Sequence, residues 1–370
     1  VLFASEVKAL IRDSAVSAEL DPSGIAQTFT FWTSIAPQTV FRGVRELPPG
    51  RWIRFSGSKG AGSAEEKTKE EVYWEPAFPP FSTADRQTAG EVAEELRDLL
   101  MGAVRLRFTR SDVPVAAYLS GGIDSSITAA LMHRVTDARF KTFSLRFAES
   151  EYDEGQSQRR MVELLGSDHT EVRVSARDIG TVFPEVVRHT ERPLLRTAPA
   201  PMYLLSRLVS DSGHKEVVTG EGGDEVFGGY DIFRETLVRK FIAAHPHSPE
   251  QTDIILMLYP WLKRSPAEVP AFARSFFRRS LDADDPAMSH RGRWRSAASI
   301  ARLLQEDFRH EVAACEPERE FLERMPDGAG EWHLYDRGFT PACVGKTFPS
   351  SSDRALLAVH PHVRGEDQSA

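Results

Sequence analysis

The sequence has few cysteines, no excess of basic residues and no long apolar segments. Its 370 residues include two cysteines, Cys315 and Cys343, which form neither a disulfide framework nor a metal-ligand pattern. The net charge of −8 argues against a nucleic-acid-binding surface. No apolar run reaches the length of a membrane span, and no signal peptide is visible. These absences favour a cytoplasmic protein with no nucleic-acid or membrane partner.

The remaining composition is that of a globular protein, with 41% hydrophobic and 27% charged residues. This length fits two domains. We expect one domain over residues 1–77, a proline-rich linker over 78–89, a second domain over 90–325 and an atypical, non-native tail over 326–370. Because the chain begins at Val1 inside a predicted strand, we also expect the natural N-terminus to lie upstream.

The stretch that organises the chain is SGGIDSS, from Ser120 to Ser126. The apolar run 113–119 predicts a buried strand before it, and residues 127–132 predict a helix after it. Glycines let the backbone approach an anion, and the N–H groups of a helix start point at it. A carboxylate in such a cradle repels phosphate unless a cation lies between them, so Asp124 indicates Mg²⁺. The alternative is an ordinary capped glycine turn, but the whole unit favours a phosphate site.

Strands and helices alternate through the second domain. Helical spacing covers residues 91–109, 153–165, 177–188 and 202–209, and strand patterns cover residues 113–119, 140–147, 170–174 and 215–219. This alternation predicts an α/β fold in which helices flank a parallel sheet. Ligands of such sheets bind beyond the carboxyl ends of the strands.

The rest of the chain gives less regular patterns. We expect strands at 1–3, at 71–74 and in two short runs within 40–55, helices at 5–11 and 21–31, and a loop at 57–70. After the second domain's sheet we expect helices at 232–243, 252–262, 270–280 and 299–312. The basic cluster at 290–295 is interpreted as a solvated face.

A second motif, GEGGDEVFGGY, follows the fourth predicted strand and runs from Gly220 to Tyr230. Five glycines and three carboxylates are unfavourable in one segment unless they are used, because glycine adds chain entropy and like charges repel. A plain acidic surface loop is the alternative. Asp124 and Asp224 both follow strands of one predicted sheet, so we predict that they hold Mg²⁺ on a nucleotide.

Together the two motifs resemble the asparagine synthetase family of glutamine-dependent amidotransferases. Residues 196–207 resemble the family's segment before the second motif, and residues 2–10 resemble the end of its glutaminase domain. The resemblance covers about residues 1–325. It implies an ATP-pyrophosphatase fold of the adenine nucleotide alpha hydrolase type. The C-terminal remnant of an N-terminal-nucleophile glutaminase domain, residues 1–77, would precede it.

The resemblance also implies a reaction. Aspartate attacks MgATP to give β-aspartyl-AMP and pyrophosphate, and ammonia derived from glutamine then releases asparagine and AMP. The implied contacts to pyrophosphate are Ser120, Gly121, Gly122, Asp124 and Ser125. Leu145 would contact adenine through its backbone, Gly220 the nucleoside, and Asp124 and Asp224 the Mg²⁺. Glu221 would be the base that helps ammonia attack, and Glu225 would position aspartate. Whether the protein forms a homo-oligomer stays an open question at this point.

Three features of the family are missing. The catalytic cysteine with most of its glutaminase domain, the aspartate-binding segment and a later transition-state lysine are not found. We therefore expect a fragment truncated at both ends, with little glutamine-dependent activity. Two alternatives stay open: a β-lactam synthetase-like or peptide-cyclising relative that adenylates another carboxylate, and a non-catalytic fragment that binds MgATP.

Overall fold

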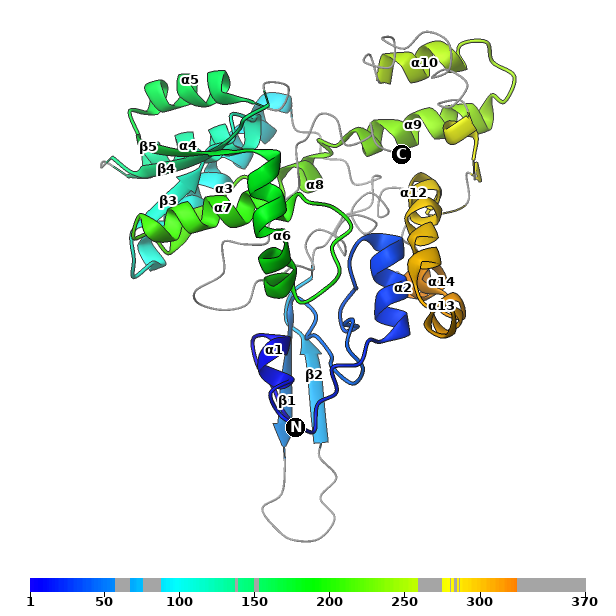
Figure 1. Cartoon of the computed structure of the whole chain (residues 1–370). Helices are drawn as coiled ribbons and strands as arrows, with labels where there is room; N and C mark the ends of the chain where they lie inside the picture. The colour runs from blue at the N-terminus through cyan, green and yellow to red at the C-terminus, as the bar shows by residue number, and fades with distance from the viewer. Residues whose placement is uncertain are drawn as a thin grey trace. The chain divides into compact units, whose positions relative to one another are not determined.

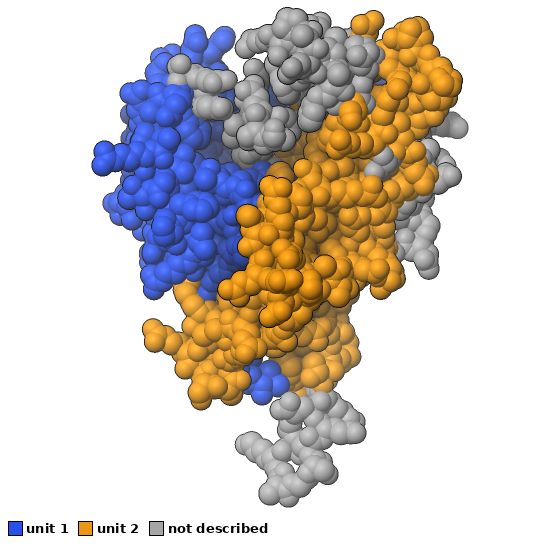
Figure 2. Space-filling view, turned by 45° about the vertical axis from the view of Figure 1, so that its right-hand side comes forward, with its two compact units in different colours: residues 1–6, 84–227, 348–370 blue, residues 7–83, 228–347 orange. Residues whose placement is uncertain are grey.

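The computed structural model describes residues 1–56, 67–75, 88–136, 139–149, 153–258, 275–279, 281–282, 285 and 287–324 (Figure 1). The chain divides into two compact units, which Figure 2 colours separately. Unit 1 comprises Val1–Glu6, Ala84–Phe227 and Phe348–Ala370, and unit 2 comprises Val7–Thr83 and Gly228–Thr347. Both the predicted tail at 326–370 and most of the predicted linker lie outside the described residues. The domain boundaries therefore stay predictions.

Unit 1 is an α/β sandwich. Its described strands are β3 (Val115–Tyr118), β4 (Lys141–Phe147), β5 (Asp168–Val174) and β6 (Glu216–Val218), in the parallel order β5-β4-β3-β6. Its helices are α3 (Ala89–Arg110), α4 (Ile123–Val135), α5 (Gly155–Leu165), α6 (Ala176–Thr190), α7 (Pro199–Asp211) and the short α8 (Gly223–Phe227). The predicted fold class, a parallel sheet with flanking helices, is confirmed.

Strand β3 is buried on both faces, which explains its continuous apolar run. Successive side chains of a strand point to opposite faces of the sheet. Ala117 packs in a cluster with Leu131 of α4, whereas Tyr118 packs in another cluster with Leu205 of α7. Burial also raises the pKa of the Tyr118 hydroxyl to about 12. Helices from both sides therefore fix the position of β3 and of the loop that follows it.

The order in which strands are added to the sheet reverses at β3. From β3 the chain adds β4 and then β5 on one side, and it returns to add β6 on the other side. Ala117 is consequently paired with Thr142 of β4 and with Val218 of β6. Parallel α/β sheets bind ligands at the carboxyl ends of strands at such a switch point. The loops that follow β3 and β6 are therefore the first place to look for a site.

Unit 2 combines segments far apart in sequence. It contains α1 (Val7–Leu10), α2 (Pro22–Phe31), β1 (Arg51–Ser56), β2 (Lys67–Val72), α9 (Asp231–Ala244), α10 (Gln251–Leu258), α12 (Met288–Ala298), η3 (Ser299–Leu303), α13 (Glu306–Ala313) and α14 (Pro317–Glu323). Strands β1 and β2 form an antiparallel pair. Helix α2 packs against α12, α13 and α14, as Figure 1 shows. Among the described residues, no helix is long and apolar enough to cross a membrane.

Helix α2 starts and packs as its sequence suggests. The Asp21 carboxylate accepts hydrogen bonds from the backbone amides of Ser23 and Gly24, at 2.9 and 3.1 Å, and caps the helix. At the other end, the Phe31 ring lies 4.9 Å from the Trp294 ring of α12, centroid to centroid. Phe321 of α14 completes this aromatic cluster. The predicted helix at 21–31 is confirmed, with Asp21 as its cap.

Several local predictions are wrong. Residues 1–3 form no strand, and Phe3 is 86% exposed, because an apolar run forms a strand only beside another strand's backbone groups. Residues 67–70 belong to β2, so the predicted loop at 57–70 ends earlier, and its residues 57–66 lie outside the described residues. The first run within 40–55 gives only isolated bridges, at Phe41 and Arg45. The predicted helix at 299–312 divides into η3 and α13.

The basic cluster at 290–295 is not a solvated face, and that prediction is wrong. Arg293 forms two hydrogen bonds, of 2.7 and 2.6 Å, with the carboxylate of Glu235, which is 1% exposed. Arg291 binds the Asp285 carboxylate in the same way, at 2.7 and 3.0 Å. Trp294, in the same segment, is buried in a cluster with Phe31 of α2. A charged sequence can enter a core when each charge meets an opposite charge with good geometry.

His290 lies near the Arg293–Glu235 pair, and its altered pKa leads us to predict that the stability of the protein depends on pH. Burial, helped by Arg293, lowers the pKa of its imidazole to about 4 in the folded state. In the unfolded chain the pKa is about 6.5. Between these values the unfolded chain binds more protons, so stability is lost as pH falls from about 6.5 to 4, by up to about 1.4 kcal/mol per pH unit.

We expect urea unfolding, followed by tryptophan fluorescence, to show this slope in the wild type and to show a smaller slope in His290→Gln. The variant His247→Gln removes an exposed histidine and serves as the control. Equal slopes in the wild type and in His290→Gln would contradict the assignment to His290.

Candidate active site

The loop after β3 is shaped by its own hydroxyl groups. The Ser120 and Ser125 hydroxyl oxygens lie 2.8 Å apart, and the Gly122 amide donates to the Ser120 hydroxyl at 3.2 Å. Gly121 has a φ of +89°, a conformation that side chains disfavour, so the tight turn requires glycine. Helix α4 begins at Ile123, earlier than predicted, and Asp124 and Ser125 lie in its first turn.

The loop after β6 lies directly against this first turn. A Cβ atom built on Gly220 would lie 2.6 Å from the amide nitrogen of Ser125 and 2.7 Å from the carbonyl carbon of Asp124. A Cβ atom on Gly223 would lie 2.8 Å from Cγ of Asp124. These separations are shorter than real Cβ contacts. At Gly220 the nearest atoms belong to the backbone, so that position excludes a side chain, whereas a side chain at Gly223 would displace the carboxyl group of Asp124. The two sequence motifs thus meet at the switch point of the sheet.

The carboxylates of the second motif lie in different surroundings. Glu221 is exposed, and its amide donates to the Thr219 hydroxyl at 3.3 Å. Asp224 is half-buried, whereas Glu225, also in α8, is 8% exposed. Glu221 directly follows Gly220 in the sequence, and Asp224 and Glu225 directly follow Gly223. Their predicted roles therefore depend on their position next to Gly220 and Gly223.

The donor set at this position fits Mg²⁺ held with a nucleotide. Within the described residues, no group of three or more His, Cys, Asp or Glu side chains could hold a metal ion. Mg²⁺ commonly takes only one or two protein carboxylates and completes its shell with water and substrate phosphates. Asp124 and Asp224 can supply those two carboxylates. The missing side chain at Gly223 keeps space beside the carboxyl group of Asp124.

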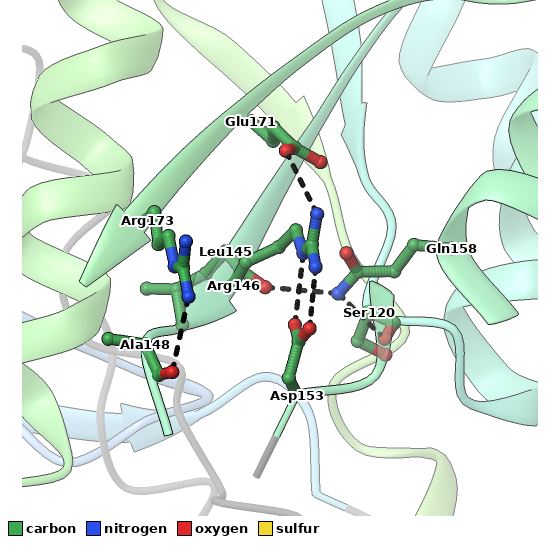
Figure 3. Close-up of polar contacts among 8 residues, drawn as sticks. All are labelled: Ser120, Leu145, Arg146, Ala148, Asp153, Gln158, Glu171 and Arg173. Carbon is green, nitrogen blue, oxygen red and sulfur yellow. Dashed lines mark hydrogen bonds and ion pairs between the residues drawn. The ribbon is translucent and has the colours of Figure 1, made fainter. Parts of the chain in front are cut away.

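Leu145, at the carboxyl end of β4, is joined to the loop after β3 through Gln158 of α5. The Gln158 side-chain amide donates to the carbonyl oxygen of Leu145 at 3.0 Å and to that of Ser120 at 3.1 Å (Figure 3). The Ser144 hydroxyl also donates to the Leu119 carbonyl, one residue before the loop. No motif surrounds Gln158, so its role could not be predicted from the sequence.

An ion pair fixes the start of α5. The Arg146 guanidinium of β4 forms two hydrogen bonds with the Asp153 carboxylate, at 3.0 and 2.6 Å, and one with Glu171 of β5 at 3.3 Å (Figure 3). These bonds from Arg146 lower the pKa of the Asp153 carboxyl group. Arg173 of β5 donates to the Ala148 carbonyl at 3.2 Å. The carboxyl ends of β4 and β5 are therefore held by side chains as well as by the strand ladder.

Comparison with protein families now identifies the chain. The asparagine synthase family model matches residues 95–335, which is more than half of the sequence. The chain belongs to the asparagine synthase family. A glutamine amidotransferase domain model also matches residues 1–74, so the predicted glutaminase remnant before the sheet is confirmed.

Proteins named as amidases and proteins named as asparagine synthetases are similar to this chain at comparable sequence identity. The amidase chyE of Penicillium rubens is 32% identical over 254 residues, covering 64% of this chain and 36% of that protein. The glutamine-hydrolyzing asparagine synthetase 1 of Bacillus subtilis is 31% identical over 241 residues, covering 65% of this chain and 36% of that protein. Asparagine synthetase 3 of the same organism is 27% identical over 250 residues, covering 63% of this chain and 38% of that protein. The chain thus spans little more than a third of each of these relatives.

The contact between the two family motifs gives a prediction. Gly220→Ala should force the loops apart, because the new methyl group meets backbone atoms of Asp124 and Ser125. We expect a loss of about 1–3 kcal/mol in the free energy of unfolding, the usual cost of overpacking. The control is Gly180→Ala, in helix α6 and with open space around it, which should be stabilised by about 0.5–1 kcal/mol. Equal stability of both variants in thermal unfolding would contradict the close contact.

Proposed function

We propose that this chain carries the synthetase site of an ATP-dependent amide-forming ligase, which converts aspartate to asparagine through β-aspartyl-AMP. The observation that supports it most is the contact of two glycine-rich loops at the switch point of a parallel sheet, in a member of the asparagine synthase family. Asp124 lies at that contact. An anion held by backbone groups beside a carboxylate is the arrangement that a metal–nucleotide complex requires.

The nucleotide would lie across the carboxyl ends of the strands. Pyrophosphate would be held by Ser120, Gly121, Gly122, Asp124 and Ser125, adenine by the backbone of Leu145, and the nucleoside by Gly220. Asp124 and Asp224 would hold Mg²⁺. When bound, that ion neutralises phosphate charge and makes pyrophosphate a better leaving group. The glycines let the backbone approach the phosphates, and the hydroxyls of the first loop donate to them.

The reaction takes two steps. An oxygen of the substrate carboxylate attacks the α-phosphorus, the bond to pyrophosphate breaks, and an acyl adenylate forms. Ammonia then attacks the acyl carbon and AMP leaves with the bonding electrons. Glu221, exposed at the start of the second loop, would accept the proton that the attacking nitrogen loses. The buried Glu225 would position the amino-acid substrate.

A second candidate is amide formation on a carboxylate other than aspartate. It is favoured by a specific observation: the amidase chyE and the B. subtilis asparagine synthetase 1 are equally similar to this chain, at 32% and 31% identity. Both candidates share the same nucleotide chemistry. They differ only in the carboxylate that the first step accepts.

Exchange of labelled pyrophosphate into ATP tests the proposal, because it reports the first step without ammonia. The full chain is mixed with MgATP, labelled pyrophosphate and either aspartate or one of a panel of other carboxylates. Exchange that depends on aspartate supports the proposal, and exchange only with another carboxylate supports the second candidate. Binding of MgATP with no exchange from any carboxylate would mean a non-catalytic nucleotide-binding fragment and would overturn both.

Replacing Glu221 should separate the two steps. In Glu221→Gln we expect pyrophosphate exchange within about threefold of the wild type, whereas amide formation from ammonium falls by about 100-fold or more, the usual contribution of a general base. The measurement compares exchange with amide product in the same preparation. The matched control is Glu216→Gln, an exposed glutamate at the start of β6. An equal loss of both activities in Glu221→Gln would contradict the role of proton acceptor.

A further inference from the structure

Gln158 is a buried polar side chain in an unusual position. It lies in the first turns of α5 and is 2% exposed. Its amide nitrogen donates to the carbonyls of Ser120 and Leu145, at 3.1 and 3.0 Å (Figure 3). Carbonyl oxygens can only accept, so these two partners fix which way the amide group faces. Its oxygen, Oε1, has no hydrogen-bond partner within the described part of the chain.

The two carbonyl groups that Gln158 binds lie at the ends of two different strands. Ser120 begins the loop after β3, and Leu145 lies near the end of β4. In the proposed site the first of these residues contacts the phosphates and the second contacts adenine. One side chain therefore connects the backbone at both ends of the nucleotide. A buried amide that leaves its own oxygen without a partner costs stability, which suggests that its position is retained for another reason.

The backbone of α5 around Gln158 is itself held in place. A Cβ atom on Gly121 would lie 3.0 Å from Cβ of Ser157 and 3.2 Å from the amide nitrogen of Gln158, so the phosphate loop packs directly on α5. The start of α5 is tied to β4 through the Arg146–Asp153 pair. Helix α5 can consequently act as a fixed platform for the loop.

We propose that Gln158 is a positioning residue for MgATP, which holds the Ser120 and Leu145 carbonyls at the separation that the bound nucleotide requires. It acts through the backbone and does not touch the substrate. This inference rests on the proposed function, because it takes both carbonyls as parts of the nucleotide site. Without the amide, the loop and the end of β4 lose their shared donor and can move independently.

Calorimetric titration of the full chain with MgATP tests this role. In Gln158→Met, which has similar volume and no donor, we expect affinity to fall about tenfold. Gln156→Met removes a glutamine from the exposed face of the same helix and should leave affinity unchanged. Wild-type affinity in Gln158→Met would overturn the inference alone. Absence of MgATP binding in the wild type would overturn the proposed function, and the inference with it.

Gln158→Glu supplies a readout that loss of packing would not change. An ionised carboxylate repels both carbonyls, whereas a protonated carboxyl group can donate to one of them. The ratio of variant to wild-type affinity for MgATP should therefore rise as pH falls from 8 to 6, and the same ratio for Gln158→Met should stay constant. A flat ratio for Gln158→Glu would overturn the inference even where Gln158→Met folds poorly.

Discussion

The close contact between two loop backbones is the constraint on which the site depends. Gly220 and Gly223 allow the loop after β6 to lie against Asp124 and Ser125 with no side chain between them. The contact is possible because β3 and β6 are neighbours in the sheet, although more than 90 residues separate them in sequence. Strand order and side-chain size therefore act together. Any change that separates these strands would also separate the two halves of the proposed metal site.

Around this contact, the backbone of the loop after β3 is held from several sides. The loop after β3 is held by its own hydroxyls, by Gln158 and by the packing of Gly121 on α5. Glu221, by contrast, is exposed. This division suits a site in which phosphate groups must be held still and a proton acceptor needs access to a second substrate.

The sequence predicted the sheet well because its strands and helices have clear periods and the two motifs follow strands. For the same reason Asp124 and Asp224 could be predicted to lie at the same edge of the sheet, and the structure does bring the two motifs together there. The partners of Gln158 could not be predicted, since they are backbone carbonyls on other elements and leave no pattern in sequence. The partly buried ion pairs of Arg291 and Arg293 were mistaken for a solvated face, because composition does not show that Asp285 and Glu235 lie opposite them.

Unit 2 is built from two segments that lie far apart in the sequence, and this affects how the chain folds. Eight residues of α2 are buried, and its packing partner α12 begins more than 250 residues later. During synthesis α2 must therefore wait on the order of tens of seconds before that partner is made, at typical elongation rates. The strands of the parallel sheet all lie within that interval. A ribosome-bound chain would thus present the complete parallel sheet while the buried residues of α2 still lacked their partner helix.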